Sequence, residues 1–232
     1  MLKQRDMSLS GLCWHSTGNI GSGLSKIMAK VLEKVERRLG EKLFIKGDRC
    51  AGPKCALVRR SYAPGVHGKG RRREPSEFGM LLREKQKIRY IYGLDDKDVK
   101  RYITIAEAQK GTFGINVLKL LERRLDNVVF RLGFADSRRM ARQVVGHGHV
   151  TVNGKIVSIP SFQVKKGSVI ALKESSIASV FKGIDDRLRS YVAPRWLALD
   201  ASRKSGTVAA DPDADDAQTT VDITKIKEFY SR

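Results

Sequence analysis

Apolar side chains recur at three- and four-residue steps in five segments of the chain, which is the spacing of residues on one face of a helix. These segments predict helices over residues 31–39, 77–92, 96–110, 116–132 and 138–145. The most regular stripe runs from Leu118 to Leu132, and Gly133 follows it as a termination signal. Ser76 and Ser137 precede two of the segments, at the position where a serine side chain caps the first N–H groups of a helix.

Alternation of apolar and polar residues, the period of a half-buried strand, occurs in the second half of the chain. Residues 150–157 alternate on both sides of Asn153-Gly154, a dipeptide that favours the type I′ turn of a β-hairpin. Further strands are predicted at 169–172 and 194–199, with a short helix over 185–192 between them. Ile223, Ile226 and Phe229 predict a closing helix.

Three segments show neither period. Gly-Pro and Pro-Gly steps and a run of Arg between Arg49 and Arg73 predict an extended basic loop. Residues 201–217 contain the run Asp211-Pro212-Asp213-Ala214-Asp215-Asp216, which predicts a solvated acidic loop. Residues 1–27 predict a disordered extension, and we interpret Met28 as the natural start of the protein.

The charge of the chain narrows its possible partners. The 232 residues carry a formal net charge of +20, while 41% of them are hydrophobic, which is enough for a small core. A field of this sign concentrates polyanions, meaning nucleic acid or, less often, an anionic membrane. The basic residues lie in Arg-rich runs with Gly and Pro and not on one long amphipathic helix, so nucleic acid is the expected partner. A basic protein that is merely well solvated is the alternative.

Two segments concentrate the candidate contacts to nucleic acid. Residues 54–89 hold eleven Lys and Arg against three Glu, and Arg suits phosphate because its planar fork matches two oxygens at once. From this segment the predicted contacts are Arg59, Arg60, Tyr62, His67, Lys69, Arg71, Arg72, Arg73, Arg83, Lys85, Lys87 and Arg89. From the second segment they are Arg123, Arg124, Arg131, Ser137, Arg138, Arg139, Arg142, His147, His149, Asn153 and Lys155. We expect the arginines that follow Ser137 to face solvent, and Tyr62 and His67 to stack on unpaired bases.

Three runs of residues carry a resemblance to a known family. They are Leu121-Glu122-Arg123-Arg124-Leu125-Asp126-Asn127-Val128-Val129, Ser137-Arg138-Arg139-Met140-Ala141-Arg142 and His147-Gly148-His149-Val150-Thr151-Val152-Asn153-Gly154. Together they closely resemble the bacterial small-subunit ribosomal protein S-four family and its namesake RNA-binding domain. The resemblance extends upstream through Tyr62-Ala63-Pro64-Gly65-Val66-His67-Gly68 and ends with Glu228-Phe229-Tyr230-Ser231-Arg232. It covers about Met28 to Arg232 and is poor in 201–220.

The resemblance implies an α+β fold with a mostly helical N-terminal domain and a small RNA-binding domain of paired helices packed on a short antiparallel sheet. The expected domains are residues 28–115 and 116–185, with 186–232 returning to the body of the protein. The family function implied is that of a primary 16S ribosomal RNA binder at a five-way junction of the 5′ domain, which nucleates assembly of the small-subunit body in the cytoplasm. The resemblance also implies ribosomal proteins S-five and S-twelve as neighbours and an influence on decoding accuracy.

The cysteines depart from part of this family. Some members hold zinc with four Cys, and Cys50 and Cys55 match the spacing of the later pair, but the early pair is missing. Cys13 and His15 could complete a Cys₃His set only from within the predicted extension. We therefore expect no metal, and we interpret Cys50 and Cys55 as small loop residues.

Two other functions share the same residues. Related domains are appended to pseudouridine synthases, whose catalytic Asp has an Arg-Leu-Asp context like that of Asp126, but here this triplet lies within the predicted RNA-binding domain. We expect no enzyme, cofactor, small-molecule substrate or membrane partner. A regulatory RNA binder outside the ribosome, for example one that binds its own messenger, would use the same basic surface.

Overall fold

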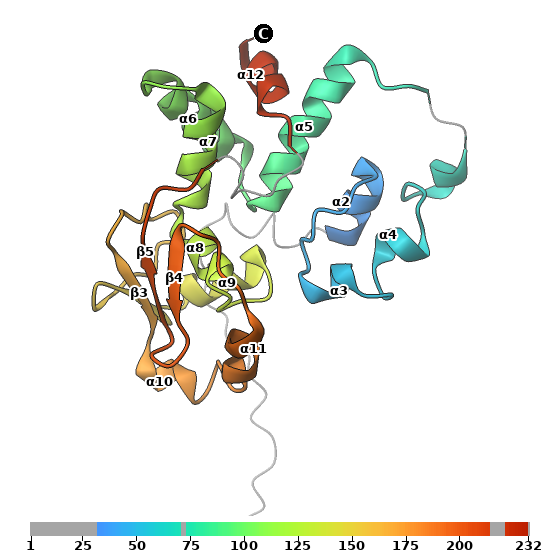
Figure 1. The fold of residues 1–232 in the computed structure, drawn as a ribbon. Helices are drawn as coiled ribbons and strands as arrows, with labels where there is room; N and C mark the ends of the chain where they lie inside the picture. The colour runs from blue at the N-terminus through green and yellow to red at the C-terminus, as the bar shows by residue number, and fades with distance from the viewer. Residues whose placement is uncertain (1–31, 71–72, 214–220, 232) are drawn as a thin grey trace, which may run out of the picture. The chain divides into compact units, whose positions relative to one another are not determined.

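The computed structural model describes residues 32–70, 73–213 and 221–231. Helices dominate the first part: α2 (Leu32–Leu39), α3 (Asp48–Ala51), α4 (Ala56–Arg59), α5 (Glu77–Ile91), α6 (Asp96–Ala108) and α7 (Phe113–Glu122), with a 3-10 turn η1 (Val66–Lys69) (Figure 1). The Ser76 hydroxyl accepts a hydrogen bond from the N–H of Gly79 (3.2 Å), as its predicted capping role requires. The predicted extension 1–27 and Arg71 and Arg72 lie outside the described residues.

The second part combines helices with one sheet. Helices α8 (Leu125–Arg131) and α9 (Arg138–Gly146) precede strands β1 (Val150–Val152), β2 (Lys155–Ile156) and β3 (Val169–Leu172). Helices α10 (Glu174–Ile177) and α11 (Ile184–Ser190) then lead to β4 (Leu197–Asp200) and β5 (Ser205–Val208). All neighbouring strands are antiparallel, in the order β2-β1-β3-β5-β4. The predicted α+β class, with paired helices on a short antiparallel sheet, is confirmed.

The hairpin between β1 and β2 has the predicted turn. Asn153 and Gly154 both have positive φ angles, 50° and 79°, which the type I′ turn requires at its two central positions. The turn fixes the register in which Val152 pairs with Lys155. One face of the hairpin therefore turns Val150 and Val152 into the core.

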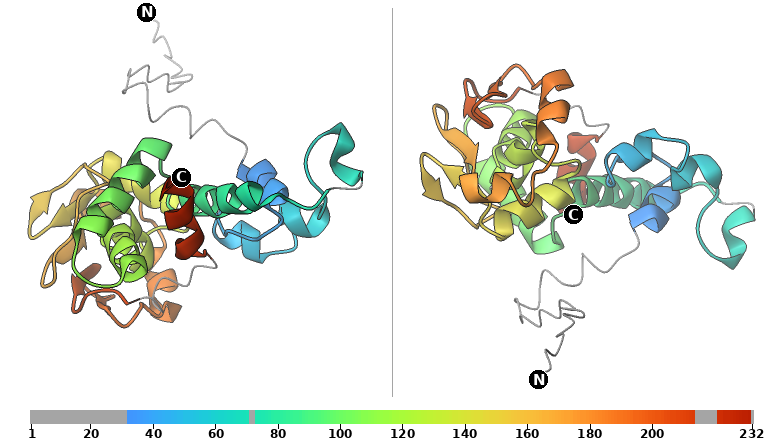
Figure 2. Two further views of the ribbon diagram at one scale, coloured as in Figure 1. Left: turned by 90° about the horizontal axis from the view of Figure 1, so that it is seen from above. Right: turned by 90° about the horizontal axis from the view of Figure 1, so that it is seen from below.

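Two hydrophobic clusters hold the described residues together. The first draws on residues between Leu43 and Leu121, and the closing helix α12 (Ile223–Ser231), which packs against α5, adds Ile226 to it (Figure 2). The second draws on residues from Leu125 to Val208 and covers one face of the sheet with α8 and α9. Full burial of each such side chain stabilises the fold by roughly 1.5–3 kcal/mol.

The predicted single helix over 116–132 is wrong, because the chain breaks between α7 and α8. Arg124 is extended (φ −66°, ψ 137°) and forms an isolated bridge with Gln163, while the N–H of Leu125 donates to the carbonyl of Phe162 (2.8 Å). The apolar spacing continues across the break, but Leu121 belongs to the first cluster and Leu125 to the second. The apolar stripe is continuous in the sequence, but its two halves pack into different clusters. Its periodicity alone therefore does not reveal the break.

Two predicted loops contain regular structure. The segment 49–73 is not uniformly extended, since it holds the end of α3, then α4 and η1. Residues 201–217, predicted as a loop, include β5, whose partners β3 and β4 lie on both sides of it; residues 214–220 lie outside the described part. The sequence of β5, Ser-Gly-Thr-Val, lacks the bulky residues that usually signal a strand. No helix in the described part of the chain is long and apolar enough to cross a membrane.

Gly206 in β5 is required by the packing of Leu132, the residue that follows α8. A Cβ atom at position 206 would overlap the Leu132 side chain, which is completely buried. We expect Gly206→Ala to destabilise the protein by about 1–3 kcal/mol, the usual cost of overpacking a core, in urea unfolding followed by circular dichroism. The neighbouring Ser205→Ala is the control and should stay within about 0.5 kcal/mol of the parent. Equal stability of the two variants would contradict this account of β5.

Candidate nucleic-acid interface

Helix α9 carries the arginines predicted to contact nucleic acid. Ser137 caps it, since its hydroxyl accepts from the N–H of Met140 (3.3 Å). Arg139 is exposed as predicted, but the prediction that Arg138 and Arg142 also face solvent is wrong. Their side chains reach back over the preceding helices, because polar groups on α5, α7 and α8 lie within their reach.

Arg138 is held among aromatic rings and polar groups. Its Nε donates to Asn127 Oδ1 (2.7 Å), and its guanidinium lies 4.6 Å from the ring centroid of Phe130 and 5.0 Å from that of Tyr92. Burial lowers the pKa of Arg138 from its usual value. Arg142 donates through Nη1 to the carbonyl of Gly93, just after α5. Both arginines thus tie α9 to the helices before it.

A buried carboxylate, that of Glu122 at the end of α7, links three of these elements. It is completely buried and accepts hydrogen bonds from Tyr92 Oη (2.7 Å), Asn127 Nδ2 (2.8 Å) and Arg131 Nε (3.0 Å). Burial, reinforced by the Glu122 charge, raises the pKa of Tyr92 well above its ordinary value. Burial alone would lower the pKa of Arg131, but the Glu122 charge, the hydrogen bond to Glu122 and the nearby Tyr92 and Tyr191 together raise that pKa.

A second buried ion pair fixes the break between α7 and α8. Arg124 binds the Asp126 carboxylate through two bonds, Nε to Oδ1 (3.0 Å) and Nη2 to Oδ2 (2.7 Å), and Nη1 donates to Tyr102 Oη (2.6 Å). Asp126, the aspartate of the Arg-Leu-Asp triplet, also accepts from the N–H of Asn127 (2.8 Å). Its carboxylate is therefore engaged by Arg124 and by a backbone N–H in the first turn of α8.

Two lysines of α5, Lys85 and Lys87, are also buried. Lys87, predicted to contact nucleic acid, is buried, with its Nζ 2.7 Å from both Glu41 Oε1 and Glu84 Oε1. Burial would lower the pKa of Lys87, but the hydrogen bonds that it donates to these two carboxylates, with their charges, raise it overall. Lys85 pairs in the same way with Asp96 (2.7 Å). Glu84 lies one turn before Lys87 on α5 itself, whereas Glu41 and Asp96 lie outside α5, so the sequence alone did not show the pairs with Glu41 and Asp96.

The turn between α9 and β1 carries one exposed and one half-buried histidine. His147 is exposed, whereas His149 is half-buried with its Nδ1 2.9 Å from Ser176 Oγ. Burial first, and the charges of His147 and Lys173, lower the pKa of His149. Asn153 is exposed, but its Oδ1 accepts from the N–H of Val169 (2.8 Å). This bond ties the hairpin turn to the start of β3.

The predicted contacts thus fall into three groups within the described residues. Those exposed are Arg59, Arg60, His67, Lys69, Arg73, Arg139, His147, Asn153 and Lys155. Those half-buried are Tyr62, Arg83, Arg89, Arg123, Ser137, Arg138, Arg142 and His149. Those buried are Lys85, Lys87, Arg124 and Arg131. Exposed members of the set occur on α4, η1, α9 and the hairpin, so both parts of the fold contribute.

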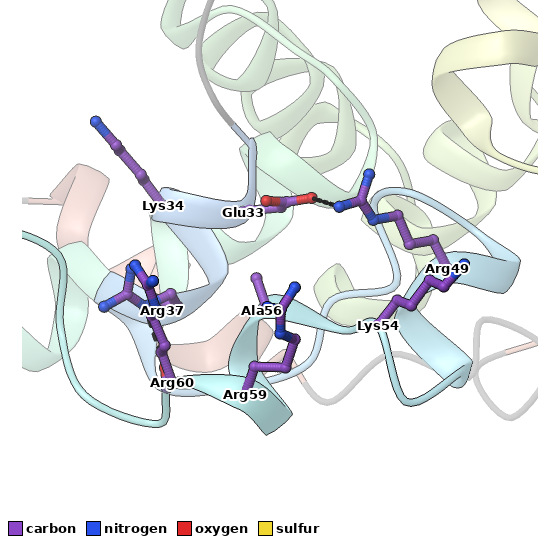
Figure 3. Close-up of a pocket in the computed structure, with 8 residues that line it drawn as sticks. All are labelled: Glu33, Lys34, Arg37, Arg49, Lys54, Ala56, Arg59 and Arg60. Atoms are coloured by element: carbon purple, nitrogen blue, oxygen red, sulfur yellow. Dashed lines mark hydrogen bonds and ion pairs between the residues drawn. The ribbon is translucent and has the colours of Figure 1, made fainter.

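A cavity near α2 and α4 adds basic residues that the sequence reasoning missed, namely Lys34, Arg37 and Arg49 (Figure 3). They lie outside the segment 54–89 in which basic residues were counted, but the fold brings them beside Arg59 and Arg60. The high share of Lys and Arg along 34–38 was the available signal.

Cys50 lies beside α2, the helix that carries Glu36. Cys50 and Cys55 are buried free thiols, and Cys50 Sγ lies 3.7 and 3.8 Å from the two oxygens of Glu36. Burial raises the pKa of the Cys50 thiol. The Glu36 carboxylate also accepts from the N–H of Ile45 (3.2 Å), so it ties α2 to the segment that carries the thiols. Within the described residues no group of three or more His, Cys, Asp or Glu side chains could hold a metal ion; Cys13 and His15 lie outside that part.

The paired helices, the hairpin and the sheet define an α+β RNA-binding protein: a family model described as the S4 domain matches residues 123–170, and one described as the ribosomal protein S4/S9 N-terminal domain matches residues 32–122. Small ribosomal subunit protein uS4 of Desulfitobacterium hafniense is 51% identical over 202 residues, which cover 84% of this chain and 94% of that protein. The proteins of the same name from Syntrophomonas wolfei and Heliobacterium modesticaldum are 50% and 52% identical over 197 residues. The chain belongs to the uS4 family of small ribosomal subunit proteins.

The Glu122 cluster generates a stability prediction. Glu122→Gln keeps the shape of the side chain but leaves the buried charge of Arg131 without its partner, so we expect a loss of about 3 kcal/mol or more in urea unfolding. The matched control is Glu174→Gln on the exposed start of α10, which should change stability by less than about 0.5 kcal/mol. A loss of similar size in both variants, or in neither, would show that Glu122 does not have this role.

Proposed function

We propose that this chain is a structural component of the small ribosomal subunit, in the cytoplasm, and a primary binder of 16S ribosomal RNA that nucleates assembly of the subunit body. The observation that carries the proposal is the identity of about 50% to uS4 proteins over 84% of the chain. The distribution of exposed basic side chains over both parts of the fold supports it, because a junction of RNA helices presents phosphates in several directions.

The proposed mechanism is recognition of RNA shape. Exposed Arg and Lys contact phosphates, and each neutralised phosphate releases counterions, so affinity falls steeply with salt. The buried Glu122 network connects α9, through Arg138 and Asn127, to the helices before it, so the exposed Arg139 of α9 is carried on a fixed element. Buried members of the predicted set, such as Arg124 and Arg131, act in this mechanism by positioning and not by contact.

The finer parts of the proposal concern the RNA site and the neighbours. We place the chain at the five-way junction of the 16S 5′ domain, next to ribosomal proteins S-five and S-twelve, with an influence on decoding accuracy. The family membership supports these assignments. Phosphate and 2′-hydroxyl contacts carry most of the recognition of folded RNA helices, and Tyr62 and His67 stay predicted to stack on unpaired bases.

The direct experiment compares the affinity of the chain for the 16S 5′ domain with that for an unrelated duplex RNA of equal length, across a salt titration. A ratio of about a thousand or more at physiological salt is typical of specific nucleic-acid binders and is the expected result. Equal affinity for the two RNAs would leave only electrostatic attraction and would contradict the proposed function.

The exposed cations of the S4 domain generate a second test. We expect the double variant Arg139→Gln and Lys155→Gln to bind the 5′ domain more weakly and to flatten the log–log salt slope by about 1.5, since each lost phosphate contact removes about 0.7–0.9. Arg189→Gln with Arg203→Gln removes the same charge from exposed positions outside the predicted set and is the control. If the control flattens the slope equally, the assignment of this surface is wrong.

A further inference from the structure

An aspartate that follows β5 forms an ion pair with one of the predicted RNA contacts. Asp211 is the first residue of the acidic run 211–216 and comes shortly after Val208, the last residue of β5. Its Oδ1 lies 3.5 Å from Arg123 Nη2, and the two side chains are 46% and 29% exposed. A carboxylate therefore occupies an arginine at the start of the matched S4 domain, residues 123–170.

Arg123 is held in place by the loop that precedes β3. Its Nε donates to the carbonyl of Val164 (3.2 Å), and its own carbonyl accepts from the N–H of Val164 (2.9 Å). Val164 is buried in the second hydrophobic cluster, so these two bonds fix the arginine relative to the core. With Nε engaged by the backbone, the guanidinium is held where its Nη2 meets Asp211.

The backbone on both sides of Asp211 is held as well. The N–H groups of Ala209 and Ala210 donate to the carbonyl of Trp196 (2.9 and 3.3 Å). Pro212 is buried although both of its neighbours are exposed, and its burial leaves no N–H without a partner, because proline has none. The carboxylate of Asp211 is thus kept beside Arg123 by its own backbone, which lowers the entropy that a surface ion pair usually loses.

The acidic run begins beside a basic turn. Lys165 and Lys166 are exposed, and they were not among the predicted contacts. The N–H of Gly167 donates to the carbonyl of Val208 (2.8 Å), and the N–H of Val208 donates to that of Ser168 (3.1 Å). The turn that carries the two lysines is therefore bonded to the end of β5, from which the acidic run continues.

A carboxylate and a phosphate compete for the same guanidinium, because both bind it through anionic oxygens. A phosphate that approaches Arg123 must displace Asp211, and it meets the exposed carboxylate of Asp213 two residues further on. The pair is open to solvent, so its attraction is weak and is screened by salt. Displacement by a polyanion is therefore possible, but it reduces the affinity that Arg123 would otherwise provide.

We propose that Asp211 is an internal competitor of nucleic acid: it occupies Arg123 in the free protein, and an RNA phosphate takes its place in the complex. The inference rests on the proposed function, because it takes Arg123 as an RNA contact. It adds an autoinhibitory contact, by which the start of the acidic run lowers the affinity of the S4 domain for any polyanion that reaches Arg123.

The first experiment measures the affinity of the full chain for an unrelated duplex RNA across a salt titration. Asp211→Asn keeps the size of the side chain and frees Arg123 for one phosphate. We expect this variant to bind about three- to fivefold more tightly at physiological salt, with a log–log salt slope steeper by about 0.7–0.9. The control Asp186→Asn removes the same charge and frees Arg189 (3.7 Å), which lies outside the predicted set. It should change the affinity by less than about 1.5-fold.

The second experiment is a double-mutant cycle with Arg123→Gln. If Asp211 acts through Arg123, Asp211→Asn in the Arg123→Gln background changes the affinity no more than Asp186→Asn does in that background. A gain that persists without Arg123 would be a general effect of net charge.

The third experiment needs no RNA and no change at Arg123. Phenylglyoxal modifies accessible guanidinium groups, and mass spectrometry locates the modified residue. We expect Asp211→Asn to raise the rate of modification at Arg123 at least about twofold over the parent protein, since a weak surface ion pair is lost. Asp186→Asn should leave that rate unchanged.

The proposal is overturned if Asp211→Asn and Asp186→Asn change the RNA affinity equally, if the gain persists in the Arg123→Gln background, or if Arg123 is modified at the same rate in the parent and in Asp211→Asn. Failure of the proposed function would instead appear as equal affinity of the parent for the 16S 5′ domain and for the unrelated duplex, a comparison that none of these experiments uses.

Discussion

The buried carboxylate of Glu122 is the interaction on which the arrangement of this protein depends. It sits at the end of α7, where the first hydrophobic cluster gives way to the second, and it accepts bonds from Tyr92 before it and from Asn127 and Arg131 after it. An unpaired charge in such a place would cost several kcal/mol, so the partners must come together for either side to fold well. A buried polar group thus links residues next to both apolar clusters.

This constraint divides the basic residues into two kinds. A net charge of +20 suggests a surface covered with cations, yet Arg124, Arg131, Lys85 and Lys87 are buried and paired with carboxylates. These pairs hold the helices together. The cations on α4, α9 and the hairpin are instead exposed to solvent and accessible to a nucleic acid. A rigid support of this kind suits the recognition of an RNA shape, because little ordering remains for the moment of binding.

Local signals in the sequence predicted the fold well wherever one element was decided by its own residues. The Ser76 and Ser137 caps, the Asn153-Gly154 turn and the strand at 169–172 are confirmed. The break at Arg124 and the strand β5 were missed because both depend on distant partners, Gln163 for the first and Leu132 for the second. The burial of Arg131 could not be predicted for the same reason, since its carboxylate partner Glu122 lies on the preceding helix. Which of the exposed residues contact RNA stays a prediction.

The position of α12 affects the order in which the chain can fold during synthesis. All residues of the second cluster, Leu125 to Val208, lie in one stretch of the chain and are available as soon as that stretch has emerged. The first cluster lacks Ile226 until almost everything else has been made, and the bond from the N–H of Asp222 to Glu84 spans 138 residues. Closing so long a loop is slow compared with local contacts. The part made first is therefore the part completed last, and until then α5 exposes the apolar surface that α12 will cover.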